Sequence, residues 1–251
     1  MKIPVTALVL HCATAVLAQP DAPGSVDDWL RRGQASERTG ELDAALEAYG
    51  RASQADPGDW RPYLLRGQVR FRRGDVAGSL TDFDAVVARA PDREPFLWQR
   101  GISQFYAGRY DACRRQFELH RTVNPDDVEN AAWHFLCVAA EDGIAEARRR
   151  LLPVGPDPRP PMTAVYDLYR GKARVDDVLA KGGVAAPGPG FGDDGAAFYA
   201  HLYVGLYLEA IDRTDLALPH VEAAAGLDFP HYMGDVAVVH LTRLRSGTEE
   251  P

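Results

Sequence analysis

Apolar residues recur at intervals of three and four along much of the chain, which is the spacing of an amphipathic helix. The stretch from about Trp29 to Thr39 shows this spacing first, and we expect a helix there. Gly40 follows, and glycine readily adopts the left-handed conformation that ends a helix. The next helix should end at Asp56, because Pro57 steers the residue before it out of the helical region. The pattern predicts a helical hairpin.

This hairpin is repeated with a period of 34 residues. Each unit carries an Arg-Gly pair in its first helix, a glycine seven residues later, an aromatic residue in its second helix and a closing proline. The markers are Gly33, Gly67 and Gly101; Gly40, Gly74 and Gly108; Tyr49, Phe83 and Phe117; and Pro57, Pro91 and Pro125. Because one hairpin cannot bury its own apolar face, these units are expected to stack.

The markers resemble the tetratricopeptide-repeat (TPR) family, whose motif combines an aromatic residue, a glycine, a small residue, a second aromatic residue and a closing proline. On this resemblance, residues 26–127 hold three tandem TPR units. Arg stands before each motif glycine, where Leu is usual, and Arg66 could pair with Asp82 across its unit. The resemblance implies an all-α fold, an α-solenoid of TPR hairpins.

Beyond these units the pattern weakens. We expect a degenerate helical hairpin, then a Pro/Gly-rich connector with short helices, then a fourth TPR-like unit and a capping helix. These parts cover residues 128–152, 153–197, 198–231 and 232–245, respectively. The last helix is expected to cap the exposed end of the stack, as repeat arrays require.

The order of these parts resembles the NlpI family of bacterial envelope TPR lipoproteins. Outside the repeats, the segments YDLYRGKARVDDVLA and FYAHLYVGLYLEAIDRTDLALPHVEAAA carry the likeness. The resemblance implies an envelope adaptor that dimerises and brings peptidases and cell-wall hydrolases together.

Residues 1–18 have the pattern of a secretory signal peptide, with Lys2 ahead of an apolar run and cleavage expected before Gln19. A lipoprotein signal would acylate Cys12, but it needs Gly, Ala or Ser at the position of His11. We therefore expect export to the periplasm or beyond, without a lipid anchor. No other segment approaches the roughly 20 apolar residues of a membrane span.

Composition narrows the classes further. An apolar share of 46% with 25% charged residues describes a globular chain rather than a disordered one. The net charge of −8 argues against nucleic-acid binding, which needs a basic surface. Outside the signal, Cys113 and Cys137 remain. An exported protein could join them, but we expect two buried unpaired thiols, because neither their number nor their spacing forms a disulfide framework.

No catalytic or metal-binding signature stands out. None of the seven His residues has the HExxH spacing, and GxSxG, P-loop and CxxC motifs are absent. His134 and His201 are expected to be core residues. The GPGFGDDG segment at 188–195 does not follow the order of ligands in an EF-hand. We predict no enzyme, cofactor or metal, and a flexible loop at 182–195; a hydrolase or metalloprotein built on that loop is the least favoured alternative.

In TPR stacks the first helix of each hairpin lines the concave face. Transferred to this chain, the partner-binding positions are Leu30, Gln34, Arg38, Leu64, Gln68, Phe71, Arg72, Trp98, Ile102, Phe105 and Tyr106. They change from polar and cationic to aromatic, which suits an extended or helical segment with apolar anchors. Trp98 equally suits packing on the next helix. Gln34 and Gln68 stand where carboxylate-clamp TPRs have Asn, so we do not predict recognition of a C-terminal carboxylate.

The sequence thus predicts a protein-binding adaptor of the bacterial cell envelope, with a protein or peptide partner. The alternative is a structural protein that associates with itself, as a homodimer for example, through its C-terminal half.

Overall fold

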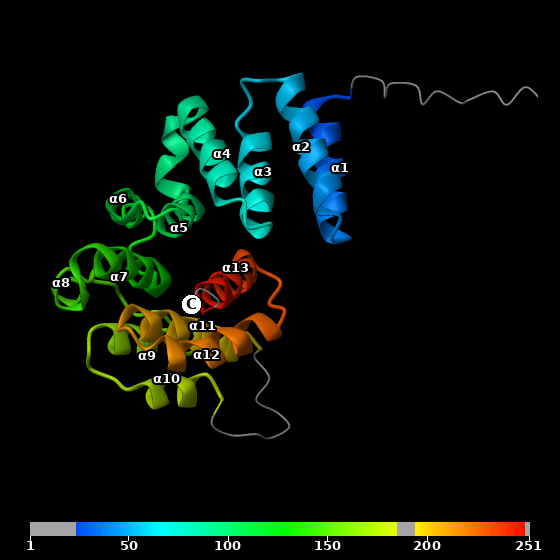
Figure 1. The fold of residues 1–251 in the computed structure, drawn as a ribbon. Helices are drawn as coiled ribbons and strands as arrows, with labels where there is room; N and C mark the ends of the chain where they lie inside the picture. Colours follow the sequence, from blue (N-terminus) through cyan, green and yellow to red (C-terminus); the bar gives the residue numbers. More distant parts are fainter. Residues whose placement is uncertain (1–23, 185–193, 249–251) are drawn as a thin grey trace, which may run out of the picture.

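The computed structural model describes residues 24–184 and 194–248, which form helices and connecting loops without a strand (Figure 1). The helices are α1 (Val26–Arg38), α2 (Leu42–Ala55), α3 (Arg61–Arg72), α4 (Val76–Arg89), α5 (Trp98–Tyr106), α6 (Tyr110–His120), α7 (Val128–Asp142), α8 (Ile144–Arg149), α9 (Met162–Tyr169), α10 (Val175–Lys181), α11 (Asp194–Ala210), α12 (Thr214–Gly226) and α13 (Tyr232–Thr248), with a 3-10 helix η1 (Pro91–Phe96) before α5. The predicted all-α class is confirmed. The predicted signal peptide and residues 185–193 of the predicted loop lie outside the described residues.

Local sequence signals set the ends of the hairpin helices. Helix α1 begins after Ser25, whose hydroxyl accepts from the Asp28 N–H at 3.2 Å while the Asp28 carboxylate accepts from the Ser25 N–H at 3.1 Å. This reciprocal cap satisfies two backbone donors that the helix start would otherwise leave unpaired. The turn to α2 passes through Gly40, whose φ of +76° is a conformation that side chains other than glycine rarely adopt.

Glycine in the first helix of each hairpin lets the second helix approach. A Cβ on Gly33 would lie 2.3 Å from Tyr49 Cε1, and one on Gly101 would lie 2.8 Å from Phe117 Cε2. Such distances are below any real contact, so only glycine fits without a shift. The Arg66 guanidinium bridges its hairpin as anticipated, with Nε 2.9 Å and Nη2 2.6 Å from the two oxygens of Asp82.

The helices are arranged as an arc. Hairpins α1–α2, α3–α4 and α5–α6 continue into α7 and α8, and the chain then passes beneath them as α9 to α12 (Figure 1). The last helix was expected to cap the exposed end of the stack, and its contacts extend further than that end. Helix α13 packs on α12 and also lies against α3 on the inner side of the arc. Its buried residues, among them Met233, Val236 and His240, recur at intervals of three and four, so one face of the helix is enclosed.

The core has two parts of unequal size. The first hairpin packs on the second through a small cluster of Leu30, Ala45, Tyr49, Ala52 and Val69. A much larger cluster extends from Phe71 through α5, α7, α9 and α11 to Ala237 on α13. The first hairpin is therefore attached to a body whose other helices share one core.

The cysteines are joined, contrary to the expectation of two free thiols. Cys113 on α6 and Cys137 on α7 form a disulfide with a Cα–Cα distance of 5.9 Å, within the range that the bond requires. Both are fully buried. Cys113 belongs to the second helix of the third hairpin, and Cys137 to the helix that follows it. Spacing alone did not reveal the pair because the two cysteines are 24 positions apart, on two packed helices joined by a turn.

Candidate partner-binding site

The inner face of the arc contains the predicted partner-binding positions, but the structure divides them. Leu30 is not available, because it belongs to the small core and is only 7% exposed. On the same face, Gln34 and Arg38 are exposed, while Leu64 and Gln68 are half-buried. We call these four residues the open part of the inner face. Among the described residues, Arg38 has no carboxylate within ion-pair distance.

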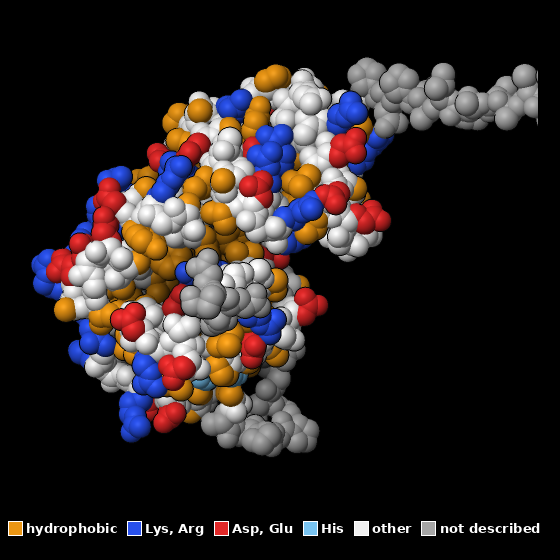
Figure 2. Space-filling model, in the orientation of Figure 1, with side chains coloured by type: hydrophobic (Ala, Val, Ile, Leu, Met, Phe, Trp, Pro, Cys, Tyr) orange, Lys and Arg blue, Asp and Glu red, His pale blue; other side chains and the backbone are white. Residues whose placement is uncertain are grey.

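The remaining predicted positions lie on α3 and α5, and four of them contact α13. We call these positions the covered part. They are Phe71, Arg72, Trp98, Ile102, Phe105 and Tyr106. Phe71 and Ile102 are completely buried. Apolar side chains gather in the hollow between α3–α5 and α13 (Figure 2). The chain's own last helix therefore occupies much of the surface that the sequence offered to a partner.

Aromatic contacts hold α13 in place. The Tyr232 ring stacks on Phe71 with centroids 5.3 Å apart and meets Trp98 edge-on at 5.2 Å. Further along, the His240 ring lies 6.0 Å from Tyr106. Trp98 thus packs on the C-terminal helix, while its half-buried side chain remains partly accessible.

One ion pair crosses the same seam. Arg72 Nε donates to Asp235 Oδ1 at 2.8 Å, and its Nη1 is 3.7 Å from Glu37 Oε2 at the end of α1. Burial raises the pKa of Asp235, and the neighbouring Arg72 opposes that shift. The contact residues Tyr232, Asp235, His240 and Arg243 follow helical spacing along one side of α13.

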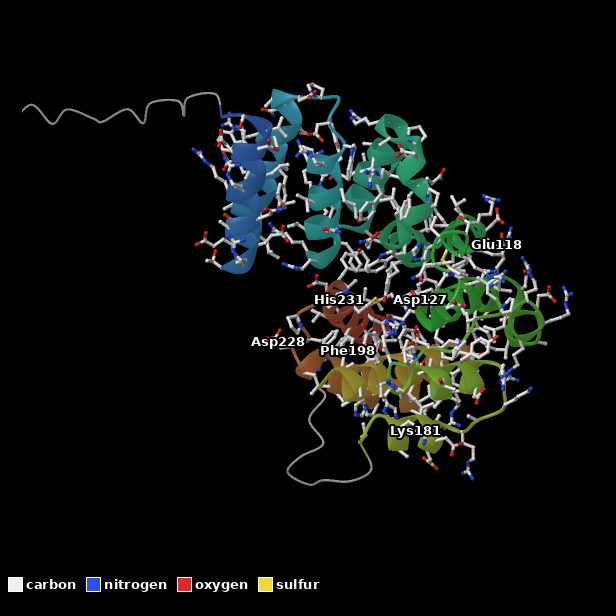
Figure 3. The ribbon with its side chains drawn as sticks, turned by 180° about the vertical axis from the view of Figure 1, so that it is seen from behind. Glu118, Asp127, Lys181, Phe198, Asp228 and His231 are labelled. Carbon is white, nitrogen blue, oxygen red and sulfur yellow. A yellow bond between two sulfur atoms is a disulfide. The ribbon has the colours of Figure 1, made fainter. Side chains whose placement is uncertain are left out.

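A polar cavity of about 250 Å³ lies where α5, α6 and α7 meet the end of the connector, α11 and the loop before α13. Its buried wall includes Phe117, Asn130 and Trp133, whereas Asn124 and His231 at its edge are exposed. Figure 3 labels Asp127 and His231, which lie between the repeat hairpins and the C-terminal helices. The cavity therefore opens to solvent at the seam beside the covered part.

Charged groups cluster along one side of this cavity. Arg159, from the Pro-rich connector, reaches Glu129 Oε1 at 2.7 Å, Asp127 Oδ1 at 2.8 Å and Asp157 Oδ2 at 2.6 Å. The Tyr203 hydroxyl donates to Glu129 Oε2 at 2.8 Å. Burial and then the charge of Asp127 raise the pKa of Glu129 to about 7, although Arg159 and Tyr203 act in the opposite direction. One guanidinium thus forms ion pairs with three carboxylates.

Sequence reasoning missed these residues. It treated 128–140 as an ordinary apolar helix and 153–161 as a connector without chemistry. A signal was present, since Glu129 and Asn130 are polar residues at the start of a helix that is otherwise almost wholly apolar. Nothing in the sequence indicated that Arg159 would reach them across the fold.

Four of the histidines lie in contacts between side chains of the fold. His134 is buried with Nε2 3.4 Å from Glu118, and buried His240 lies 3.1 Å from Glu209. His201 and His220 face each other with their Nδ1 atoms 3.0 Å apart. Burial lowers the pKa of all four. In residues 24–184 and 194–248, no three His, Cys, Asp or Glu side chains are placed to hold a metal ion together.

The hairpin geometry defines a helical repeat solenoid, and comparison with known proteins finds a likeness over its N-terminal part. A tetratricopeptide-repeat family model matches residues 10–59 and 30–94. Tetratricopeptide repeat protein 36 of Bos taurus is 38% identical over 84 residues, or 32% of this chain and 44% of the relative. The Mus musculus protein is 35% identical over 92 residues, or 35% and 49%. The chain thus spans about half the length of these relatives, and the matches support the TPR family on its N-terminal side.

Solved structures give a weaker likeness. The MamA protein of Desulfovibrio magneticus RS-1, from residue 41 to its end, is 13% identical, covers 81% of this chain and 94% of its own, and has a TM-score of 0.49. YrrB, described as a TPR protein with an unusual peptide-binding site, is 14% identical, with coverages of 86% and 90% and a TM-score of 0.45. These values support no conclusion about what this chain binds.

Repeat solenoids typically use an extended concave surface to bind other proteins. No helix in the described part of the chain combines the length and the apolar character needed to cross a membrane.

Proposed function

We propose that the protein is a binding adaptor that holds a helical or extended segment of a partner protein on the open part of its inner face. The observation that carries this proposal is the docking of α13. This helix lies along the same face through Phe71, Trp98 and Tyr106, so the face accommodates a helix. It continues beyond α13 to the half-buried Gln68 and to Gln34 and Arg38, which are exposed.

The open part favours a partner with acidic and amide groups. Arg38 offers an exposed guanidinium that forms no ion pair with the described residues, and Gln34 and Gln68 each offer a donor and an acceptor. Leu64 adds a half-buried apolar contact. These side chains bind rather than react, and we propose no catalytic role.

Site-specific photocrosslinking tests this assignment. A photoreactive amino acid at Gln34 should yield crosslinks to a partner protein, whereas the same group at Gln54 should not. Gln54 is also exposed but lies on α2, the second helix of the same hairpin. Arg38→Glu should abolish the crosslink from Gln34, while Arg51→Glu on α2 should leave it unchanged. Equal crosslinking from both helices would overturn the assignment.

We further propose that the adaptor is exported to the bacterial envelope. The signal-like pattern of residues 1–18 supports this, and so does the Cys113–Cys137 disulfide, because such bonds persist in oxidising compartments. Fusion of residues 1–18 to a phosphatase that is active only after export should give activity, and Lys2→Glu in the leader should reduce it. Activity equal to that of a leaderless reporter would overturn export. The resemblance to NlpI-type proteins stays a prediction.

Self-association is a second candidate, favoured by apolar side chains exposed on the C-terminal half. Leu216 and Leu227 are 44% and 37% exposed on and beside α12. Sedimentation over a range of concentrations should then show a dimer that Leu216→Asp dissociates. A monomer at all concentrations would remove this candidate.

A further inference from the structure

The cavity at the α7 seam contains polar groups that are buried and unpaired. Asn130 is only 2% exposed, yet neither its Oδ1 nor its Nδ2 has a hydrogen-bond partner, and the buried Trp133 Nε1 has none either. A buried polar group that is left unpaired destabilises the fold, because it has given up its hydrogen bonds to water. Both residues line the cavity, so a ligand entering it would meet one acceptor and two donors that the protein leaves unused.

The charge of the cavity determines whether it attracts a cation or an anion. Asp127, Glu129 and Asp157 together share the single cation of Arg159, which leaves an excess of negative charge when all three are ionised. His120 adds another acceptor. Its Nδ1 lies 2.8 Å from the Pro95 carbonyl oxygen, which can only accept, so Nδ1 carries a proton, and in the neutral imidazole Nε2 offers a lone pair. An anion would be repelled and a cation attracted.

The other walls also favour a cation. Trp98, Phe117 and Tyr199 line the cavity together with Trp133. Aromatic rings attract ammonium groups through their electron-rich faces. A primary ammonium supplies three N–H donors for the carboxylates, Asn130 Oδ1 and His120 Nε2. The unused N–H groups of Asn130 and Trp133 need an acceptor next to that ammonium.

We propose that this cavity binds a primary ammonium group with a carbonyl oxygen beside it, as found at the amino terminus of a peptide and in a free amino acid. The ammonium lies toward the Asp127–Glu129 side, and the carbonyl accepts from Asn130 Nδ2 or Trp133 Nε1. This site is separate from the open part of the inner face, and it does not rest on the adaptor function.

Titration of the indole N–H signals in ¹⁵N NMR spectra of the full chain tests the proposal. Glycinamide, which carries both groups, should shift the Trp133 signal with a dissociation constant of about a millimolar, a reasonable affinity for so few atoms. Signals of the distant Trp29 and Trp60 should stay in place. N-acetylglycinamide, which lacks the charge, should bind at least about tenfold more weakly, a difference near 1.4 kcal/mol. Equal binding of the two, or no shift of Trp133, would overturn the proposal.

The side-chain assignment is tested by Asn130→Leu, which keeps the volume but removes both polar groups. This variant should lose glycinamide binding while unfolding at the same or a higher urea concentration, because it removes an unsatisfied amide. The matched control is Gln104→Met, which changes another buried amide, on α5, that does not line the cavity. It should bind as the native protein does. Unchanged binding by Asn130→Leu would refute the assignment.

The two sources of the ammonium are separated by comparing glycinamide with glycine. The carboxylate of glycine would add a negative charge to a cavity that already has an excess of it, so tighter binding of glycinamide identifies a peptide terminus as the ligand. Tighter binding of glycine identifies a free amino acid.

Discussion

The covered and open parts of the inner face differ in composition and in their exposure to solvent. The covered part presents Phe71, Trp98 and Tyr106, and the chain's own α13 packs on it. The open part presents Gln34 and Arg38, and both remain exposed. A large aromatic side chain left in water forgoes the stabilisation of about 25 cal/mol per Å² of buried apolar area, whereas polar side chains lose little. The comparison teaches that an inner position of a repeat stack is a partner-binding position only where its side chain tolerates exposure.

The core follows the same division. Behind the covered part lies the large cluster that joins α5, α7, α11 and α13. Behind the open part lies the small cluster around Tyr49. The first hairpin is therefore expected to unfold locally at a lower free energy than the rest.

The largest expected effect is that of Phe71→Ala in the covered part. Phe71 is fully buried and stacks on Tyr232, so its truncation should reduce the free energy of unfolding by about 3 to 5 kcal/mol. Urea unfolding followed by circular dichroism measures this loss. Gln68→Ala, three residues earlier on the same helix, is the control and should cost no more than about 0.5 kcal/mol. Comparable losses for the two variants would break the distinction between the parts.

The disulfide should have the next largest effect. Cys113 and Cys137 join α6 to α7 behind the covered part and enclose a loop of 24 residues. A cross-link of this length stabilises a fold by about 3 kcal/mol. Reducing agent, or replacing both cysteines by Ala, should lower the unfolding free energy by that amount. Hydrogen exchange should show the loss in α6 and α7 and leave α1 and α2 unchanged; an equal change in α1 would contradict the division of the core.

The hairpins could be predicted from the sequence because the residues that determine them lie close together in the chain. The φ of +76° at Gly40 and the contact of Gly33 with Tyr49 follow from one unit of the repeat. The Arg66–Asp82 pair was also accessible, since both residues belong to one hairpin. The contacts between distant parts of the chain were not predicted.

The position of α13 is the clearest case of such a contact. The helix itself was expected, but its docking joins Arg72 to Asp235 across 163 positions. The periodicity of the sequence does not indicate a contact between residues so far apart. The same holds for Arg159, which reaches Glu129 from a connector that showed only prolines and charge. The sequence therefore predicted which positions form the candidate face. It could not predict that α13 divides them into a covered and an open part.

A smaller effect is expected from Glu129, which lies in the cavity beside the covered part. Its pKa of about 7, against 4.5 for the ordinary group, means that the folded state holds the proton more firmly than the unfolded state does. Stability due to this group therefore falls as the pH rises from about 4.5 to 7. Relative to Glu129→Gln, which does not titrate, the native protein should lose on the order of 1 to 3 kcal/mol over this window.

Urea unfolding of both proteins at several pH values measures the difference. The buried histidines also make stability depend on pH. Because their pKa values are lowered, stability rises with pH below about pH 6.5. Both proteins contain these histidines, so their contribution is absent from the difference between the two. A difference that is constant with pH would show that Glu129 titrates normally.

The smallest effect on stability is expected in the open part, where it sharpens the comparison most. Gln34 and Arg38 are exposed and make no ion pair with the described residues, so Gln34→Ala and Arg38→Ala should each change the unfolding free energy by no more than about 0.5 kcal/mol. The same two variants should weaken the binding of a partner on this face, because they remove its donors and its free cation. Effects on binding without effects on stability are the signature of a surface kept for a ligand. A loss of stability comparable to that of Phe71→Ala would instead mean that these side chains support the fold, and the inner face would then have no open part.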